Sequence, residues 1–254
     1  MNNQLDKDGF VFLNGVYPQR EIDYCNKEMN FTLGEEHVFT KVNSKQDFAN
    51  DKYYINNTNS LINNYSKMLY YKVPVINVGG NKDTVTDKGL IDIYNADKMF
   101  PFFEKYFDID LMQSILKKLT NIEWTHYKTN CKFSHNVKNP SQVHQDNQET
   151  CVKFCIYLTD ILEVDHGSNI IIYKSHRDIN RINNRKNLKY FTGVKGDVLI
   201  SFQNAFHGRN PNYNSLVAYC TYYFVPKLRH YRNFDNYIYR HKMAQDKELQ
   251  SSAY

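Results

Sequence analysis

The sequence contains little glycine and proline, with 10 and 6 of these residues among 254, and it has no long apolar run. A helix that crosses a bilayer needs about 20 mostly apolar residues, so we expect no membrane-spanning segment. The first residues show no basic stretch followed by an apolar core, which argues against a secretory signal. Scarce glycine and proline favour an ordered chain over a disordered one. We therefore expect a folded cytoplasmic protein without a membrane partner.

Cysteine is also scarce, and its positions show no metal-binding spacing. Cys151 and Cys155 are four residues apart, which on a strand places them beyond the reach of a disulfide bond. Their odd number and their scatter favour reduced thiols, in agreement with a cytoplasmic location. The five cysteines are Cys25, Cys131, Cys151, Cys155 and Cys220.

Aromatic residues are abundant, with 21 Tyr and 16 Phe, and 41% of the chain is hydrophobic. A chain of this length can bury a substantial core, and barrels often reach this size undivided, so we expect one domain over residues 1–254. The net charge of +5 is modest and is densest over residues 227–242, among aromatic side chains. Such a mixture can bind single-stranded nucleic acid. A packed C-terminal segment with solvated charges is the favoured interpretation, so we expect no nucleic-acid partner.

Strand-like segments dominate the second half of the chain. They are rich in aromatic and β-branched residues and are separated by Gly, Asn or Pro. Helical spacing of apolar residues occurs mostly before them, which favours a double-stranded β-helix, or jelly-roll, over a parallel sheet. The predicted strands are 9–13, 124–132, 150–159, 169–173, 190–194, 197–202 and 216–225, and the predicted helices are 18–29, 96–107 and 110–119.

The expected domain has three parts: a helical, insert-rich part over about 1–120, a jelly-roll core over about 121–226 and a C-terminal extension over 227–254. Within the first part, residues 43–97 are polar, rich in Asn and weakly periodic. The short apolar run 71–78 predicts a strand that ends in a turn at Gly79 and Gly80. The end of the extension, 237–254, is expected to be an exposed helix.

The pair His144-x-Asp146 lies between a polar loop and an apolar, strand-like run. On an extended segment side chains alternate, so this imidazole and this carboxylate face the same side and can bind one ion. His207, after the strand-like segment 196–202, can supply a second imidazole. Two histidines and one carboxylate on one face of a metal suit non-haem Fe(II) and leave positions open for O₂ and substrate. The alternative is a surface histidine beside an Asx turn.

Four pieces of the sequence resemble, in order and spacing, the phytanoyl-CoA dioxygenase-like (PhyH-like) Fe(II)/2-oxoglutarate oxygenases. The resemblance extends over roughly residues 5–225, and where the family usually has Pro-Gly-Ser-His this chain has Tyr173-Lys174-Ser175-His176. It implies a jelly-roll fold with Fe(II) held by His144, Asp146 and His207, and with 2-oxoglutarate and O₂ as co-reactants. The pieces are residues 5–13, residues 144–146, residues 157–160 through 167–169 to 174–177, and residues 196–198 leading to 207–208.

The resemblance further implies hydroxylation of an unactivated C–H bond of a small molecule. Family members that halogenate have a small residue where this chain has Asp146, so a hydroxylase or related oxidase is expected. Two alternatives stay open. One is an Fe(II) oxidase or oxygenase of the same fold that does not use 2-oxoglutarate, and the other is a non-catalytic jelly-roll binding module, against which the intact triad argues.

The family generally binds the distal carboxylate of 2-oxoglutarate with an Arg about ten residues beyond the second His, and this chain has no basic residue in 214–219. Arg209 follows His207 by two residues and can share its face of a strand. Lys153 lies on the strand after the His-x-Asp pair, where some other oxygenases of this fold carry a carboxylate-binding Lys. We favour Arg209 slightly over Lys153. Gln145, between the two ligands, is a further candidate because its position in the family can approach the cosubstrate.

Three arginines, Arg177, Arg181 and Arg185, are four residues apart, which would align them on one helical face at the barrel rim. A solvated face is the usual explanation, and an anionic substrate group bound by Arg177 and Arg181 is the functional one. His176, in the Ser-His loop that the family places at the rim, is a candidate substrate contact, although capping of that loop is the favoured role. In Asp165-His166-Gly167-Ser168-Asn169 we expect a turn in which Gly167 has positive φ. The sequence carries no signal of an oligomeric state.

Overall fold

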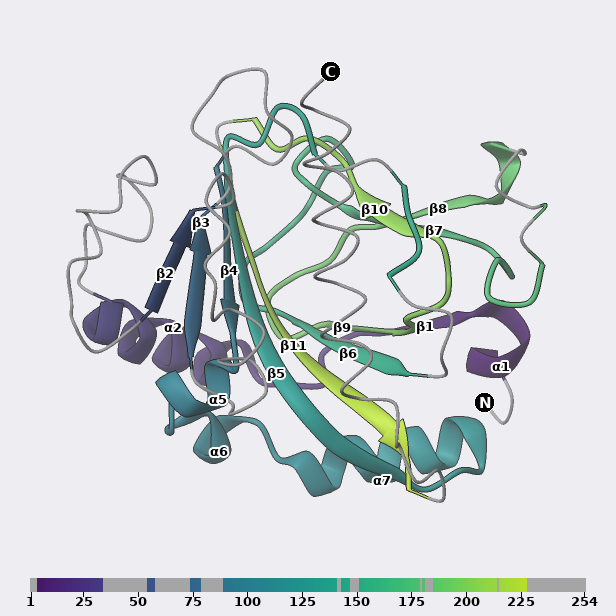
Figure 1. Cartoon of the computed structure of the whole chain (residues 1–254), viewed down its shortest axis with the longest axis horizontal. Coiled ribbons are helices and arrows are strands. Elements are labelled where there is room, and N and C mark those ends of the chain that lie inside the picture. The colour runs from purple at the N-terminus through teal and green to yellow at the C-terminus, as the bar shows by residue number, and fades with distance from the viewer. Residues whose placement is uncertain are drawn as a thin grey trace.

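The computed structural model of the chain describes residues 4–33, 54–57, 74–78, 89–140, 143–146, 151–178, 180, 185–213 and 215–227. The described strands form a large sheet in the order β1-β9-β6-β11-β5-β4-β3-β2 and a small sheet in the order β10-β7-β8 (Figure 1). Their bounds are β1 Phe10–Leu13, β2 Tyr54–Asn57, β3 Val75–Val78, β4 Leu90–Tyr94, β5 Trp124–His135, β6 Val152–Tyr157, β7 Asn169–Ile172, β8 Leu188–Phe191, β9 Val198–Phe202, β10 His207–Arg209 and β11 Leu216–Pro226.

Neighbouring strands run antiparallel in both sheets, except that β2 and β3 are parallel. The two sheets face each other and form the double-stranded β-helix that the run of strand-like segments predicts, so the predicted fold class is confirmed. The described helices are α1 Gln4–Asp8, α2 Gln19–Leu33, α5 Ala96–Met99, α6 Phe103–Tyr106 and α7 Ile109–Thr120, with a short 3-10 turn at Arg185–Asn187.

Helices α2, α5, α6 and α7 lie on the side of the large sheet that faces away from the small sheet (Figure 1). The longer ones are amphipathic, and α7 buries Met112, Leu116 and Leu119. Its start is fixed by Asp108, whose side chain accepts hydrogen bonds from the backbone amides of residues 110 and 111. Strand side chains of the outward face, such as Phe154 and Phe224, complete this core and are fully buried.

A second, smaller core fills the space between the two sheets. Aromatic rings from both sheets meet there: Phe12 contacts Phe191 and Tyr157, and Tyr157 contacts Tyr219 at a centroid distance of 5.1 Å. The same strands therefore bury one set of side chains against the helices and the alternate set between the sheets, as the period of two requires.

The first strand is held at the sheet edge by a clamp at the start of β9. The buried carboxylate of Asp197 accepts hydrogen bonds from the backbone amides of Gly15, at 2.7 Å, and Val194, at 2.9 Å. Gly196 has φ +94°, and a Cβ there would lie 2.1 Å from the carbonyl oxygen of Tyr17. Only glycine fits this close approach, which explains the Gly-Asp pair in the sequence.

Several predicted elements differ in extent from those observed. The single helix predicted over 96–107 is two short helices, because Pro101 lacks the backbone N–H that a continuous helix needs. Strands β2, β4 and β10 and helix α1 were not predicted, and the strand predicted over 71–78 is β3 at its second half. The turn at Gly79 and Gly80, most of the insert 43–97 and the helix predicted at 237–254 lie outside the described residues.

Two smaller predictions are confirmed. All five cysteines are free thiols. Gly167 has φ +83°, as the turn before β7 requires. In the part of the chain that the structure describes, none of the helices combines the length and the apolar character needed to cross a bilayer.

Candidate metal centre

His144, Asp146 and His207 meet at the mouth between the two sheets. His207 begins β10, and His144 pairs with it across an isolated bridge in which each backbone amide donates to the other carbonyl at 2.9 Å. This bridge brings two segments together that are about sixty residues apart in the sequence. The extended backbone at 144 then carries Asp146 toward the same point, as the His-x-Asp spacing predicts.

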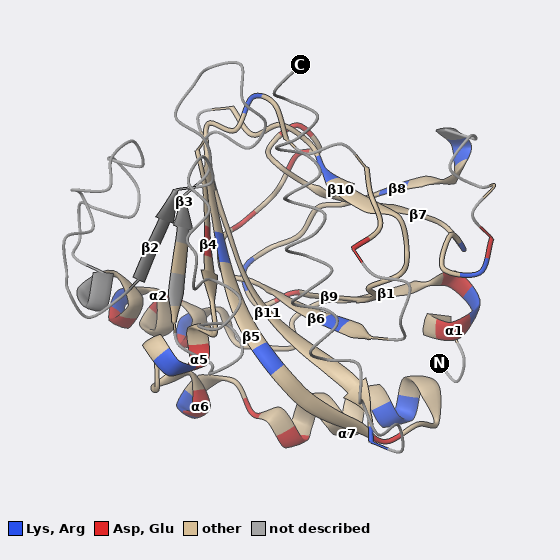
Figure 2. Cartoon of the chain, in the orientation of Figure 1, with Lys and Arg blue, Asp and Glu red and all other residues tan. Residues whose placement is uncertain are grey.

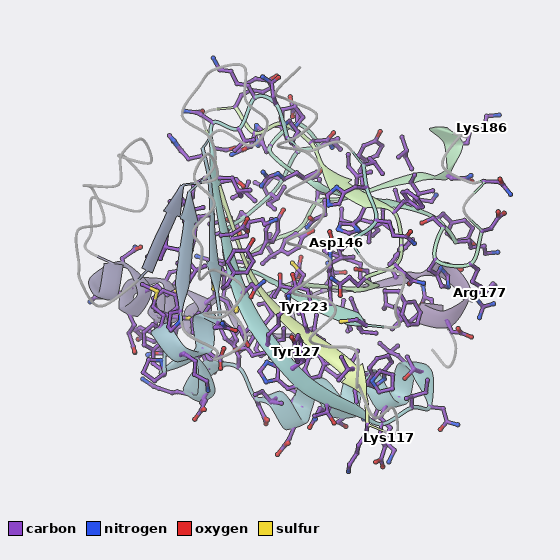
Figure 3. The ribbon with its side chains drawn as sticks, in the orientation of Figure 1. Lys117, Tyr127, Asp146, Arg177, Lys186 and Tyr223 are labelled. Atoms are coloured by element: carbon purple, nitrogen blue, oxygen red, sulfur yellow. The ribbon has the colours of Figure 1, made fainter. Side chains whose placement is uncertain are left out.

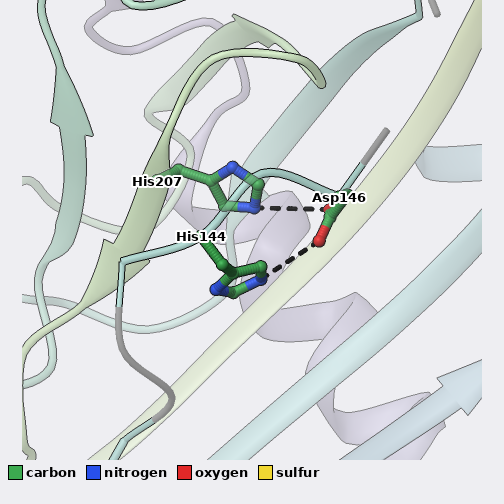
Figure 4. A group of neighbouring side chains, drawn as sticks. All are labelled: His144, Asp146 and His207. Carbon is green, nitrogen blue, oxygen red and sulfur yellow. Dashed lines mark ion pairs between the residues drawn. The ribbon is translucent and has the colours of Figure 1, made fainter. Parts of the chain in front are cut away.

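The side chains of the three residues converge on one small volume (Figure 4). The carboxylate of Asp146 lies between the rings, with Oδ1 at 3.1 Å from His144 Nε2 and Oδ2 at 3.3 Å from His207 Nε2. The ring centroids of His144 and His207 are 4.9 Å apart. One ligand atom from each residue lies within 4.8 Å of the others, which is the spread that a single ion can bridge.

The orientation of His207 is set by a hydrogen bond behind the ring. Its Nδ1 lies 2.8 Å from the carbonyl oxygen of Ala205, so Nδ1 carries the proton and the lone pair of Nε2 is open to the Lys153 ammonium, 2.8 Å away. Backbone carbonyls behind ligating histidines commonly fix the tautomer in this way.

The turn that carries His207 is held by residues of two other loops. The buried hydroxyl of Ser175 donates to the carbonyl of Ile172 at 2.7 Å and accepts from the amide of Phe206 at 2.8 Å. The amide of Gln145 donates to the carbonyl of Asn204 at 2.5 Å. Ser175 is a positioning residue that the sequence reasoning did not single out, although it stands in the Ser-His loop of the resembling family. The described contact of Gln145 is with this turn, and its role toward a cosubstrate stays a prediction.

Lys153 of β6 reaches into the centre. Its Nζ is hydrogen-bonded to Asp146 Oδ2 and lies 2.8 Å from His207 Nε2, and its side chain is only 13% exposed. Burial raises the pKa of Asp146, but the charge of Lys153 and the contacts with both histidines outweigh it and hold the pKa well below its usual range. Burial, reinforced by Lys153, lowers the pKa of His207.

These observations fit a bound metal cation. The donor set is two imidazole nitrogens and one carboxylate, which is the chemistry of a divalent transition-metal site. The ammonium of Lys153 stands where a cation contacts two of the three ligand residues, so the pocket between them already accommodates positive charge.

Arg209 lies two residues beyond His207 on the same face of β10, as predicted. Its Nη1 donates to the buried hydroxyl of Ser134 on β5, so the side chain spans from the small sheet to the large one. Burial raises the pKa of the nearby Tyr219, and the charge of Arg209 opposes that rise. A guanidinium is therefore present inside the mouth, at some distance along the strands from Lys153.

The rim residues have other partners. His176 stacks on Phe202, with centroids 5.2 Å apart, and its Nε2 donates to the carbonyl of Asp6 at 2.8 Å. Arg177 pairs with the Asp6 carboxylate at 2.5 Å, with both side chains about half exposed. Both residues thus connect α1 to the Ser-His loop. For His176 this contact agrees with the favoured role of capping that loop. The predicted helical alignment of the arginines is wrong for Arg177, which lies in a turn, and Arg181 lies outside the described residues.

A second group with metal-binding atoms, Glu163, Asp165 and His166, lies on the turn before β7. Its carboxylates are exposed, and His166 Nε2 is 3.5 Å from Glu163 Oε2. Exposed acidic groups of this kind are common without an ion, and no further contact distinguishes this one within the described residues.

No protein-family model and no curated protein matches the chain. Solved structures do match. AviO1 from Streptomyces viridochromogenes Tue57 has a TM-score of 0.61 at 12% identity, covering 89% of this chain and 93% of AviO1. HygX from Streptomyces hygroscopicus, with nickel and 2-oxoglutarate bound, has 0.58 at 13%, covering 88% and 85%. The non-heme alpha ketoglutarate dependent carbocyclase SnoK from nogalamycin biosynthesis has 0.59 at 15%, covering 87% and 80%. At these identities the likeness shows a common fold.

Proposed function

We propose that the protein is a non-haem Fe(II) oxygenase that uses 2-oxoglutarate and O₂ to hydroxylate a small molecule. The observation that carries the proposal is the convergence of His144, Asp146 and His207 within 4.8 Å at the mouth between the two sheets. The expected single domain over residues 1–254 is part of this proposal. The relation to PhyH-like enzymes is also part of this proposal. The common fold supports it but is shared by other 2-oxoglutarate-dependent enzymes.

The residues of the chain have distinct tasks in this proposal. The two histidines and Asp146 hold the iron, which when bound supplies the activation of O₂. The hydrogen bond from His207 Nδ1 to the Ala205 carbonyl keeps the ring in the ligating tautomer. The lowered pKa values keep Asp146 ionised and the His207 ring neutral at neutral pH, so protons compete little with the metal for the ligand atoms.

For the cosubstrate, Arg209 is the proposed anchor of the distal carboxylate. Its guanidinium lies inside the mouth, where two parallel N–H groups can face a carboxylate. Lys153 is the rival, but its ammonium lies directly at the ligand atoms rather than beyond them. The position of Lys153 therefore favours a role beside the iron, and that of Arg209 favours the far end of the cosubstrate.

The matching structures support the same chemistry. HygX is described with nickel and 2-oxoglutarate bound, and SnoK as an alpha ketoglutarate dependent carbocyclase. We propose hydroxylation for this chain because Asp146 occupies the third ligand position, which leaves no place on the metal for a halide ligand at that residue.

One observation favours a second candidate, a binding module that works without metal. The ammonium of Lys153 pairs with Asp146, so the chain itself supplies a cation for this carboxylate. Such a module would not need the tautomer of His207 that leaves Nε2 free to bind a metal, whereas an enzyme would.

The test is anaerobic titration of the protein with Fe(II), followed by 2-oxoglutarate. We expect one Fe(II) per chain and then the metal-to-ligand charge-transfer band of the chelated cosubstrate. Failure to bind Fe(II) would favour the module, and Fe(II) without the band at millimolar 2-oxoglutarate would favour an oxidase that does not use it. A band that is lost in Arg209→Ala but kept in Lys153→Ala would support Arg209 as the anchor.

A further inference from the structure

The segment that carries His144 and Asp146 lies directly on β10. The backbone amides of His144 and His207 donate to each other's carbonyl oxygen at 2.9 Å. One residue further along each chain segment, a Cβ at Gly208 would lie 3.3 Å from the Cα of Val143, which is a close approach of two backbones. These contacts fix the segment at His144. The direction in which the chain continues to Asp146 needs a further attachment.

Gln145 supplies this second attachment. On an extended segment the side chain between two others points away from both, so Gln145 points away from the ion that His144 and Asp146 would share. Its side-chain amide donates to the backbone carbonyl of Asn204, in the turn between β9 and β10. A bond at this residue restrains rotation of the segment about its own axis.

Asn204 joins this bond to a third segment of the chain. While its backbone carbonyl accepts from Gln145, its side-chain amide donates to the carbonyl of His176 at 3.2 Å. The Ser-His loop also holds the same turn through the hydroxyl of Ser175, which accepts from the amide of Phe206. Gln145 and the Ser-His loop therefore act on one turn, which leads into β10.

The far end of this chain of contacts is anchored. The ring of His176 stacks on Phe202, with centroids 5.2 Å apart, and its Nε2 donates to the carbonyl of Asp6 in α1. In Figure 3 Asp146 lies near the centre of the view, and Arg177, the residue after His176, lies to its right beside the first helix. The contacts thus extend from the metal centre to the first helix of the chain.

We infer that Gln145 is a positioning residue of the metal centre: by bonding to the Asn204 carbonyl it sets the orientation of Asp146 relative to His207. The inference rests on the proposed function, because this orientation matters only if the three side chains bind one metal ion. The role differs from the cosubstrate contact that the sequence predicts for Gln145. A positioning residue affects metal binding when no cosubstrate is present, whereas a residue that only contacts the cosubstrate does not.

The test compares the parent with Gln145→Leu, which keeps a side chain of similar size but cannot donate a hydrogen bond. The matched control is Gln113→Leu on α7. The side-chain amide of Gln113 donates to the backbone carbonyl of Trp124 at 2.8 Å, so the control loses the same kind of hydrogen bond on the helix-covered side of the large sheet. Neither variant changes a charged residue, so all three proteins keep the charge distribution of Figure 2.

The first measurement uses the metal-free protein. Hydrogen exchange, followed by NMR, reports the opening of the backbone bridge between His144 and His207. We expect both amides to exchange about fivefold faster in Gln145→Leu than in the parent, which is the effect of losing one hydrogen bond that holds the bridge closed. Gln113→Leu should show the exchange rates of the parent at these two amides.

The second measurement is Co(II) binding without 2-oxoglutarate, by calorimetry and by visible absorption, with Co(II) as a coloured substitute for Fe(II). Gln145→Leu should bind Co(II) about tenfold more weakly, as is typical when an outer contact of a ligand residue is lost. Its absorption bands should also differ, because they depend on the arrangement of the ligands. Gln113→Leu should match the parent in both affinity and absorption.

A double-variant cycle tests whether Gln145 acts through the turn. Asn204→Ala removes the bond to the His176 carbonyl but keeps the backbone carbonyl that Gln145 uses. If both bonds hold the same turn, the loss of Co(II) affinity in the double variant should be smaller than the product of the two single losses. A loss equal to that product would show independent effects and overturn the action through Asn204.

The remaining outcomes separate this inference from the proposed function. A parent that does not bind Co(II) overturns the proposed function, and this inference with it. A parent that binds Co(II), together with equal affinity in Gln145→Leu, overturns the inference alone, and so does an equal loss in Gln113→Leu. Parental Co(II) affinity with weaker 2-oxoglutarate binding to the Co(II) protein would assign Gln145 to the cosubstrate instead.

Discussion

The two faces of the large sheet are built from the same strands but differ in composition and in task. Toward the helices, β5 and β11 present Phe133, Cys220 and Phe224, all buried in one apolar core. Toward the small sheet, the alternate residues of the same strands include Lys128, and the neighbouring β6 adds Lys153. Because successive side chains of a strand point to opposite faces, a residue of the apolar core and a residue near the metal centre can be neighbours in the sequence. Substitutions at neighbouring positions should therefore affect different properties, stability on one face and ligand binding on the other.

The largest effect is expected on the helix-facing side. Phe224→Ala removes a fully buried ring that contacts Phe154 and should lower the free energy of unfolding by about 3–5 kcal/mol. Chemical denaturation measures this change. The metal affinity of the folded variant should equal that of the parent. A lower metal affinity in a variant that is still folded would show that the two faces do not act separately.

The reverse result is expected at the triad. Asp146→Ala removes the proposed anionic ligand and should weaken Fe(II) binding at least about a hundredfold, which corresponds to about 2.7 kcal/mol. The change in unfolding free energy should be smaller than for Phe224→Ala, because the side chain lies at a mouth and not in the packed core. Fe(II) binding as tight as that of the parent would remove Asp146 from the site.

The pH dependence of stability sharpens the comparison further. The pKa of His207 is lower in the folded protein than its ordinary value of about 6.5, chiefly through burial. As the pH falls through 6.5 the unfolded chain takes up this proton before the folded chain does, so the metal-free protein should lose stability from about pH 7 downward. Denaturation midpoints at pH 7.5, 6.5 and 5.5 measure the slope. His207→Gln should flatten it, and an unchanged slope would contradict the burial of this imidazole.

The smallest effect is expected at the rim. Arg177→Gln breaks a half-exposed ion pair with Asp6 and should lower stability by less than about 1 kcal/mol. Fe(II) binding should not change, in contrast to Asp146→Ala. A clear loss of Fe(II) affinity in Arg177→Gln would contradict the purely structural role of this ion pair.

The alternation of apolar residues predicted the fold class and most core strands, because each strand is buried on at least one face. The same logic placed His144 and Asp146 on one side of an extended segment, where the structure finds them. It missed β4, whose sequence Leu-Ile-Asp-Ile-Tyr lies in a polar region and includes the inner-face Asp92. The apolar spacing also predicted α5 and α6 as a single helix, because helical spacing continues across Pro101.

The sequence did not predict which side chains of the site contact one another. Lys153 was a candidate for binding the carboxylate of the cosubstrate. Its position in the sequence does not show that its ammonium reaches Asp146 and His207. The support of the His207 turn by Ser175 also depends on two loops that meet only in the folded chain. Contacts of this kind follow from register and turn geometry, which composition and periodicity do not specify.

The edge position of β1 has a consequence for how the chain folds. Phe10 pairs with Ser201, so the first strand finds its partner about 190 residues later. At roughly 5–20 residues per second, a ribosome needs roughly 10–40 s to make β9 after β1 has emerged. During that interval the apolar segment Phe10–Leu13 has no strand to pair with, and contacts this distant in sequence slow folding. We therefore expect that chains released before residue 198 expose this segment and aggregate, and that synthesis of β9 marks the point at which the sheet can close.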